Sequence, residues 1–139
     1  MKTLRSALVG FAVLLMATAG YAQTTKVAAT IPFNFIAGDR SYPAGDYLFS
    51  NNNGNVLLIA STENIANNKM ILSQACETLS PSDKTILVFR QMGGNYFLQQ
   101  IWVAGRTRGR ELPRSKSEIQ LAQQHETSES VIVAANLVK

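Results

Sequence analysis

Basic and aromatic side chains gather in the last third of the sequence, and they are the residues whose spacing most suggests chemistry. The cluster comprises Tyr96, Trp102, Arg106, Arg108, Arg110 and Arg114. Arginines interleaved with aromatic rings bind anionic polymers, because the guanidinium groups attract charge and the rings offer stacking surfaces. The pattern predicts a contact surface for an anionic partner. The alternative is a solvated basic turn whose charge is partly neutralised by Glu111 and Glu118.

Residues for nucleophilic or metal chemistry are sparse. A nucleophilic triad needs a base beside Ser, Cys or Thr, usually a histidine, and the one histidine, His125, lies in a polar run typical of solvent-exposed surface. Cys76 shares one side of an alternating run with Met70, Leu72 and Gln74, which predicts a small buried residue rather than a catalytic thiol. One cysteine and one histidine cannot supply the three or four ligands of a zinc site.

Carboxylates offer the remaining route to catalysis, since two of them suffice for glycoside hydrolysis. The acidic residues considered are Asp39, Asp46, Glu63, Glu77, Asp83 and Glu111. No spacing pairs any two of them, and most stand in turns or at strand ends, where such residues form local hydrogen bonds. No glycine run has the spacing of a phosphate-binding loop. The sequence therefore predicts no catalytic, cofactor-binding or metal-binding residue, and a carboxylate-based hydrolase is the less favoured alternative.

The first residues have the three parts of a secretory signal peptide. Lys2 and Arg5 supply the positive start, an apolar run follows over residues 7–17, and the small residues Gly20 and Ala22 suit a signal peptidase. The apolar run is shorter than the roughly 20 residues that a membrane-spanning helix needs. We expect cleavage after Ala22 and export to the periplasm or the extracellular space.

Cleavage would leave residues 23–139 as a single β-domain with no transmembrane segment, a chain of the size of one ordinary domain. It would remove two of the 13 basic side chains and leave 11 against 9 acidic ones, a net charge of about +2. For an exported protein of this charge, we expect an anionic envelope glycan, a lipid headgroup or another envelope protein as partner, and no nucleic acid.

Alternating apolar residues predict the elements that would position the cluster. Runs typical of strands cover residues 26–36, 46–50, 56–61, 69–78, 85–91, 96–103 and 130–135. The asparagine-rich stretch 51–55 and Gly93-Gly94 are typical of hairpin turns. Residues 104–114 predict a basic loop, and Ser115 with Glu118 has the spacing of a capping box before a helix of about ten residues from Lys116.

Seven to eight short strands at regular spacing, with one short helix in the C-terminal region, predict an all-β fold. A small antiparallel β-barrel and a β-sandwich both fit this pattern.

Several segments of the mature chain resemble a family of small secreted acidobacterial proteins to which no activity is assigned. They are Ile31-Pro32-Phe33-Asn34-Phe35-Ile36-Ala37-Gly38 (F-x-F-x-x-G), Tyr42-Pro43-Ala44-Gly45-Asp46-Tyr47 (P-A-G-x-Y) and Gly109-Arg110-Glu111-Leu112-Pro113-Arg114-Ser115 (R-E-L-P). The resemblance implies a shared fold and a secreted location, and it implies no catalytic residue.

The function predicted from these patterns is that of a secreted non-catalytic β-domain with a binding or structural role in the cell envelope and no cofactor. The alternative is a lipocalin-like carrier that holds a small apolar ligand inside a barrel. An internal cavity would distinguish the carrier from a domain that binds only through its surface.

Overall fold

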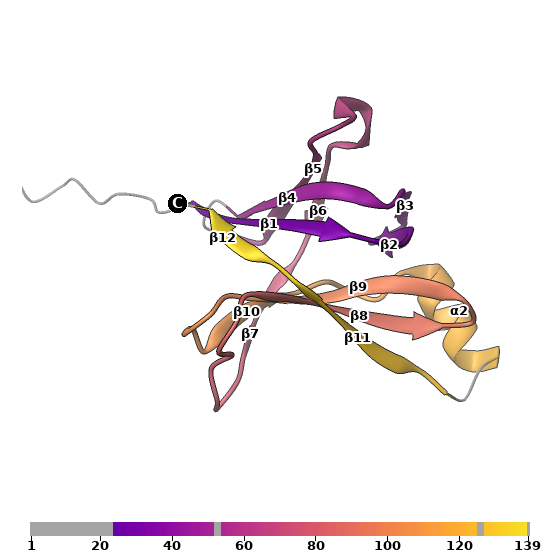
Figure 1. Cartoon of the computed structure of the whole chain (residues 1–139). Coiled ribbons are helices and arrows are strands. Elements are labelled where there is room, and N and C mark those ends of the chain that lie inside the picture. The colour runs from indigo at the N-terminus through magenta and orange to yellow at the C-terminus, as the bar shows by residue number, and fades with distance from the viewer. Residues whose placement is uncertain (1–23, 52–53, 125–126, 139) are drawn as a thin grey trace, which may run out of the picture.

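The computed structural model describes residues 24–51, 54–124 and 127–138. Within them the chain forms twelve strands in two sheets, one 3-10 turn and one α-helix (Figure 1). The predicted signal peptide, residues 1–22, and His125 lie outside the described residues, so both interpretations stay predictions.

The first sheet has five antiparallel strands in the order β12-β1-β4-β5-β6. Their bounds are β1 Thr25–Ile31, β4 Gly45–Asn51, β5 Val56–Ser61, β6 Lys69–Leu72 and β12 Asn136–Val138. The 3-10 turn η2 (Ile65–Asn67) connects β5 to β6. The register places Val27 opposite Phe49 and Phe49 opposite Ile59, and all three are buried. Because alternate residues of a strand share a face, this alternation turns one apolar side of the sheet inward.

The second sheet has seven strands. The order β11-β8-β9-β10-β7 is antiparallel, and β2 joins it by pairing with β3 and, in parallel, with β9. The bounds are β2 Phe35–Ala37, β3 Arg40–Tyr42, β7 Gln74–Glu77, β8 Ile86–Met92, β9 Asn95–Trp102, β10 Arg108–Glu111 and β11 Glu129–Ala134. Gly93 and Gly94 form the predicted hairpin turn between β8 and β9. Their φ angles of 58° and 80° are the positive values that such two-residue turns require.

The chain crosses between the two sheets four times, and at two of these crossings a single residue forms the corner between a strand of one sheet and the next strand in the other (Figure 1). Ser73 is the corner between β6 and β7, and Ala135 is the corner between β11 and β12. The Ala135 amide donates to the Thr85 carbonyl oxygen at 3.0 Å. The prediction of an all-β fold is confirmed. Because the two sheets are not closed into a barrel, a sandwich is the form that fits.

Twelve strands form where seven or eight were predicted, partly because two runs that look continuous in sequence are divided and partly because β3, β10 and β12 lie outside the predicted runs. In residues 26–36, β1 ends at Ile31 because Pro32 has no N–H to donate, and β2 begins at Phe35 in the other sheet. Residues 69–78 divide at the Ser73 corner in the same way. Alternation of side chains continues through such corners, so it does not reveal them.

Aromatic rings fill the space between the sheets around Phe35. Its ring lies 5.2 Å from that of Tyr42, 5.1 Å from that of Tyr47 and 5.6 Å from that of Phe89, measured between centroids. Phe35 and Phe89 belong to the second sheet and Tyr47 to the first, so these contacts join the two layers. Each edge-to-face or stacked pair adds about 0.5–1.5 kcal/mol beyond the burial of its area.

The helix α2 (Lys116–Gln124) begins where the capping residues predict it. The Glu118 amide donates to Ser115 Oγ at 3.1 Å, which is one half of a capping box. The other half is missing, because the buried Glu118 carboxylate instead accepts from Arg90 on β8 at 3.4 Å. This ion pair fixes the helix against the second sheet.

Tyr42 is buried, and its hydroxyl has no hydrogen-bond partner among the described residues. Burial raises the pKa of this phenol above its usual value. A buried hydroxyl without a partner loses its hydration at a cost of about 1–3 kcal/mol. We expect Tyr42→Phe to raise the free energy of unfolding by about 1 kcal/mol, because the ring keeps its packing and the unsatisfied group disappears.

Urea denaturation of the Tyr42→Phe variant measures this change, and Tyr47→Phe is its matched control. The Tyr47 hydroxyl donates to the Pro43 carbonyl oxygen, so its loss should destabilise the protein by about 0.5–1.5 kcal/mol. Equal destabilisation of both variants would show that the Tyr42 hydroxyl has a partner in solution.

Candidate functional site

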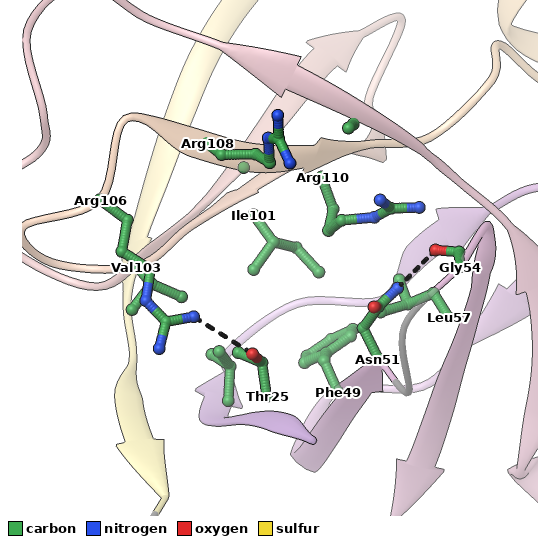
Figure 2. A pocket seen from close by; sticks show the side chains of 13 residues that line it. Thr25, Phe49, Asn51, Gly54, Leu57, Ile101, Val103, Arg106, Arg108 and Arg110 are labelled. Carbon is green, nitrogen blue, oxygen red and sulfur yellow. Dashed lines mark hydrogen bonds between the residues drawn. The ribbon is translucent and has the colours of Figure 1, made fainter. Parts of the chain in front are cut away.

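A cavity of about 320 Å³ lies between the two sheets (Figure 2). Its lining includes Thr25, the first residue of β1, and this end of β1 lies away from α2 (Figure 1). The first sheet lines it with Thr25, Val27, Phe49, Asn51, Gly54 and Leu57. The second sheet and the loop after β9 line it with Ala75, Ile101, Val103, Arg106, Arg108, Gly109 and Arg110. Ligand sites in proteins usually measure about 300–1,000 Å³, so this cavity suits a small ligand.

The deep part of the cavity is apolar. Phe49 and Leu57 line it from the first sheet, and Ile101 and Val103 line it from the second, with Ile101 between the arginines in Figure 2. All four side chains are buried. Apolar residues from both layers therefore form a wall that favours hydrocarbon over water.

Three arginines line the same cavity, and two of them come from the inner face of β10. The register pairs Arg110 with Ile101, so both residues point to the same side of the sheet. Arg108 lies two residues before Arg110 and shares that side. Residues 104–114 were predicted to be a loop, and this prediction is wrong for residues 108–111, which form a strand between β9 and β7. In this strand both arginines lie on the cavity side of the sheet, Arg110 half-buried and Arg108 exposed.

Arg110 is bound to the corner of the fold. Its Nε donates to Ser73 Oγ at 3.1 Å, and its Nη2 donates to Ser73 Oγ at 2.8 Å and to the Ser73 carbonyl oxygen at 2.9 Å. Ser73 is itself buried, and its amide donates to the Asn55 carbonyl oxygen at 2.7 Å. Arg110 is thus a structural residue as well as a lining residue.

Arg106 and Arg108 lie at the solvent-exposed side of the cavity. Arg106 donates from Nη1 to Thr25 Oγ1 at 3.1 Å, a contact across the cavity between the two sheets (Figure 2). Arg108 pairs with Glu77 at 3.1 Å, and both side chains are about 70% exposed, at 72% and 70%. The Glu77 carboxylate offsets the charge of Arg108, whereas Arg106 contacts no carboxylate among the described residues.

The other members of the predicted contact surface do not join this site. Tyr96 stacks on Phe33 with ring centroids 3.9 Å apart, within the partly buried aromatic layer. Trp102 faces the outer side of the second sheet, where its Nε1 donates to Gln100 Oε1 at 3.0 Å and its ring lines a separate shallow hollow. Arg114 is exposed just before α2 and does not line the cavity. Of the six residues predicted to form one contact surface, Arg106, Arg108 and Arg110 thus line the cavity, and Tyr96, Trp102 and Arg114 lie elsewhere. Tyr96 and Trp102 do not share a face of β9, because the register of this strand with β8 shifts between them.

Cys76 lies in β7 opposite Gly109, and it is half-buried rather than buried. The prediction for its side of the run is wrong, since Met70 and Leu72 are 72% and 69% exposed and Gln74 is also exposed. Desolvation, followed by the negative charge of Glu111, raises the pKa of the Cys76 thiol. A raised pKa lowers the thiolate fraction at neutral pH and with it the reactivity of the sulfur.

Several described carboxylates have local structural partners. Asp39 accepts from the Lys116 amide at 3.2 Å, Asp46 accepts from the Thr30 hydroxyl, and Glu77 and Glu118 pair with arginines. In the described ranges no group of three or more His, Cys, Asp or Glu side chains could hold a metal ion.

Comparison of the chain with protein-family models, curated proteins and solved structures finds no match. In the part of the chain that the structure describes, no helix has the length and apolarity needed to cross a membrane.

The apolar wall was missed by the sequence analysis, and so was the inward direction of Arg110. One sequence signal was present for the arginines: Arg108-Gly109-Arg110 alternates with period two, as strands do. Nothing local identifies which side of that strand is inside, because its partners in β9 and β7 determine it.

Proposed function

We propose that this protein is an exported, non-catalytic binding domain that carries a small ligand with an apolar body in the cavity between its two sheets. The observation that carries the proposal is the cavity itself, whose deep wall is made of Phe49, Leu57, Ile101 and Val103 from both layers. The cavity opens to solvent on the side of its arginines and is bounded by buried apolar side chains on its inner side, and an apolar lining with a few polar groups is typical of ligand sites.

The proposal joins two of the functions considered from sequence. From the predicted envelope-binding domain it keeps the exported location. From the predicted carrier it keeps a ligand site between layers of the fold, here in a sandwich rather than a barrel. The local roles of Asp39, Asp46, Glu77 and Glu118 favour a binding function over a carboxylate-based hydrolase, because a hydrolase needs two acids beside a bound substrate.

Blocking the cavity tests the proposal. Ala75 lines the cavity and is exposed, so Ala75→Trp would place an indole in the ligand space without crowding a closed core. We expect this variant to bind the neutral apolar dye N-phenyl-1-naphthylamine at least about tenfold more weakly than the unaltered protein. The indole would occupy the space in which the dye is otherwise shielded from water. Fluorescence titration measures the affinity.

The matched control is Gln74→Trp, which adds the same ring at the neighbouring exposed position, outside the cavity lining. It should bind the dye as the unaltered protein does. Equal binding by both variants, or no saturable binding by the unaltered protein, would overturn the proposal.

A further inference from the structure

The charge around the cavity is unbalanced. Arg106, Arg108 and Arg110 line it, whereas no acidic side chain is among the described lining residues. Glu77 offsets only Arg108. Low-dielectric walls strengthen the field of such charges inside a cleft and concentrate ions of opposite sign there.

The three arginines differ in what they can offer a ligand. A guanidinium carries five N–H donors. Arg110 uses three hydrogen bonds to hold Ser73, and Arg108 is paired with a carboxylate. Among the described residues the side chain of Arg106 makes one hydrogen bond, to Thr25, which places its guanidinium beside the cavity (Figure 2). Within that part of the chain, its other N–H donors have no partner.

We infer that the ligand is an amphiphile with one anionic headgroup, a carboxylate or a phosphate monoester, and that Arg106 binds this headgroup while the apolar tail lies against Phe49, Leu57 and Ile101. This inference rests on the proposed function, because it names the class of ligand that the same cavity takes. The planar guanidinium matches both headgroups through paired N–H donors. Arg110 adds positive charge on the inner face of the second sheet and keeps its structural contacts.

Ligands with tails of equal length and different headgroups separate the contribution of the headgroup to binding from that of the tail. Isothermal titration with decanoate, decyl phosphate, 1-decanol and decylammonium should give tighter binding for one or both anions than for the alcohol, and weaker binding for the ammonium ion. The affinity of the anions should fall as salt is raised through the physiological range, while that of 1-decanol should not, because only the charged contact is screened. Comparison of decanoate with decyl phosphate identifies the favoured headgroup.

Variants at the cavity test the role of Arg106. Arg106→Gln should weaken binding of the favoured anion about tenfold and leave 1-decanol unchanged, as expected for loss of a charge-assisted hydrogen bond. Arg114→Gln is the matched control, since it removes an exposed arginine that does not line the cavity. Glu77→Gln should tighten anion binding about two- to fivefold, because it frees the charge of Arg108.

The outcomes distinguish the two proposals. Binding of 1-decanol as tight as that of both anions, or an Arg106→Gln variant that binds them unchanged, would overturn the headgroup inference and leave the apolar cavity standing. Failure of all four ligands to bind would overturn the proposed function together with the inference. Circular dichroism of Arg106→Gln checks that the fold is intact, which its exposed position and single hydrogen bond lead us to expect.

Discussion

Replacing Gly109 with alanine is expected to lower the free energy of unfolding by about 1–3 kcal/mol, the usual range for forcing atoms into packed space. A Cβ at this position would lie 2.6 Å from Trp102 Cε3 and 2.7 Å from the Ile101 carbonyl oxygen. Both distances are shorter than any normal contact. We expect the upper part of the range, because the carbonyl oxygen belongs to a central strand that pairs on both sides and cannot move alone.

Two variants separate the contributions of the side chain and the backbone to this effect. Trp102→Ala removes the ring above Gly109 but leaves the Ile101 carbonyl oxygen, so the double variant Gly109→Ala/Trp102→Ala should recover only part of the loss. Urea denaturation of the two single variants and the double variant gives the coupling energy between the positions. A Gly109→Ala protein as stable as the original would show that β9 and β10 lie farther apart in solution.

Gly109 also connects the fold to the candidate site. Its missing side chain lets Trp102 pack against the outer face of β10 and lets β10 lie close to β9. With that register, Arg110 lies opposite Ile101 and points into the cavity. Gly109 thus permits the close pairing of β10 with β9 that directs Arg110 toward the cavity.

Local sequence signals predicted the elements whose chemistry is complete within a few residues. Gly93-Gly94 predicted its hairpin because positive φ is needed there, and Ser115 predicted the start of α2 because its hydroxyl accepts from the Glu118 amide. The alternation of Val27, Ala29 and Ile31 predicted a half-buried strand, and all three are buried. Each of these features depends on neighbours in the chain and not on the partner strand.

The features that the sequence could not supply depend on pairing between distant strands. Arg108-Gly109-Arg110 has weak strand propensity, so it was interpreted as a loop, but pairing with β9 and β7 outweighs that propensity. The Ser73 corner lies inside an alternating run, and a single serine with no glycine or proline beside it does not indicate the change of sheet. The cavity depends on both the pairing of β10 and the Ser73 corner, because Ala75 lies just after the corner and Arg110 lies opposite it on β10.

The second large effect is expected at Arg110, whose three hydrogen bonds to Ser73 hold the corner between β6 and β7. Ser73 is 4% exposed with the guanidinium in place, and an apolar methionine side chain at position 110 offers it no hydrogen-bond donor. Each buried acceptor left without a partner costs about 1–3 kcal/mol, and two atoms, Ser73 Oγ and the carbonyl oxygen, would lose theirs. We expect Arg110→Met to destabilise the protein by about 2–4 kcal/mol.

Arg108→Met is the matched control for Arg110→Met, because it makes the same substitution on the same face of the same strand. Its ion pair with Glu77 is about 70% exposed, at 72% and 70%, and exposed pairs contribute about 0.2–1 kcal/mol. Urea denaturation should therefore show a loss several times larger for Arg110→Met than for Arg108→Met. A corner that depends on packing alone would instead give equal losses. The double variant Arg110→Met/Ser73→Ala distinguishes the two cases. If the hydrogen bonds to Ser73 stabilise the corner, removing Ser73 Oγ as well should add little to the loss from Arg110→Met, because that acceptor no longer needs a partner.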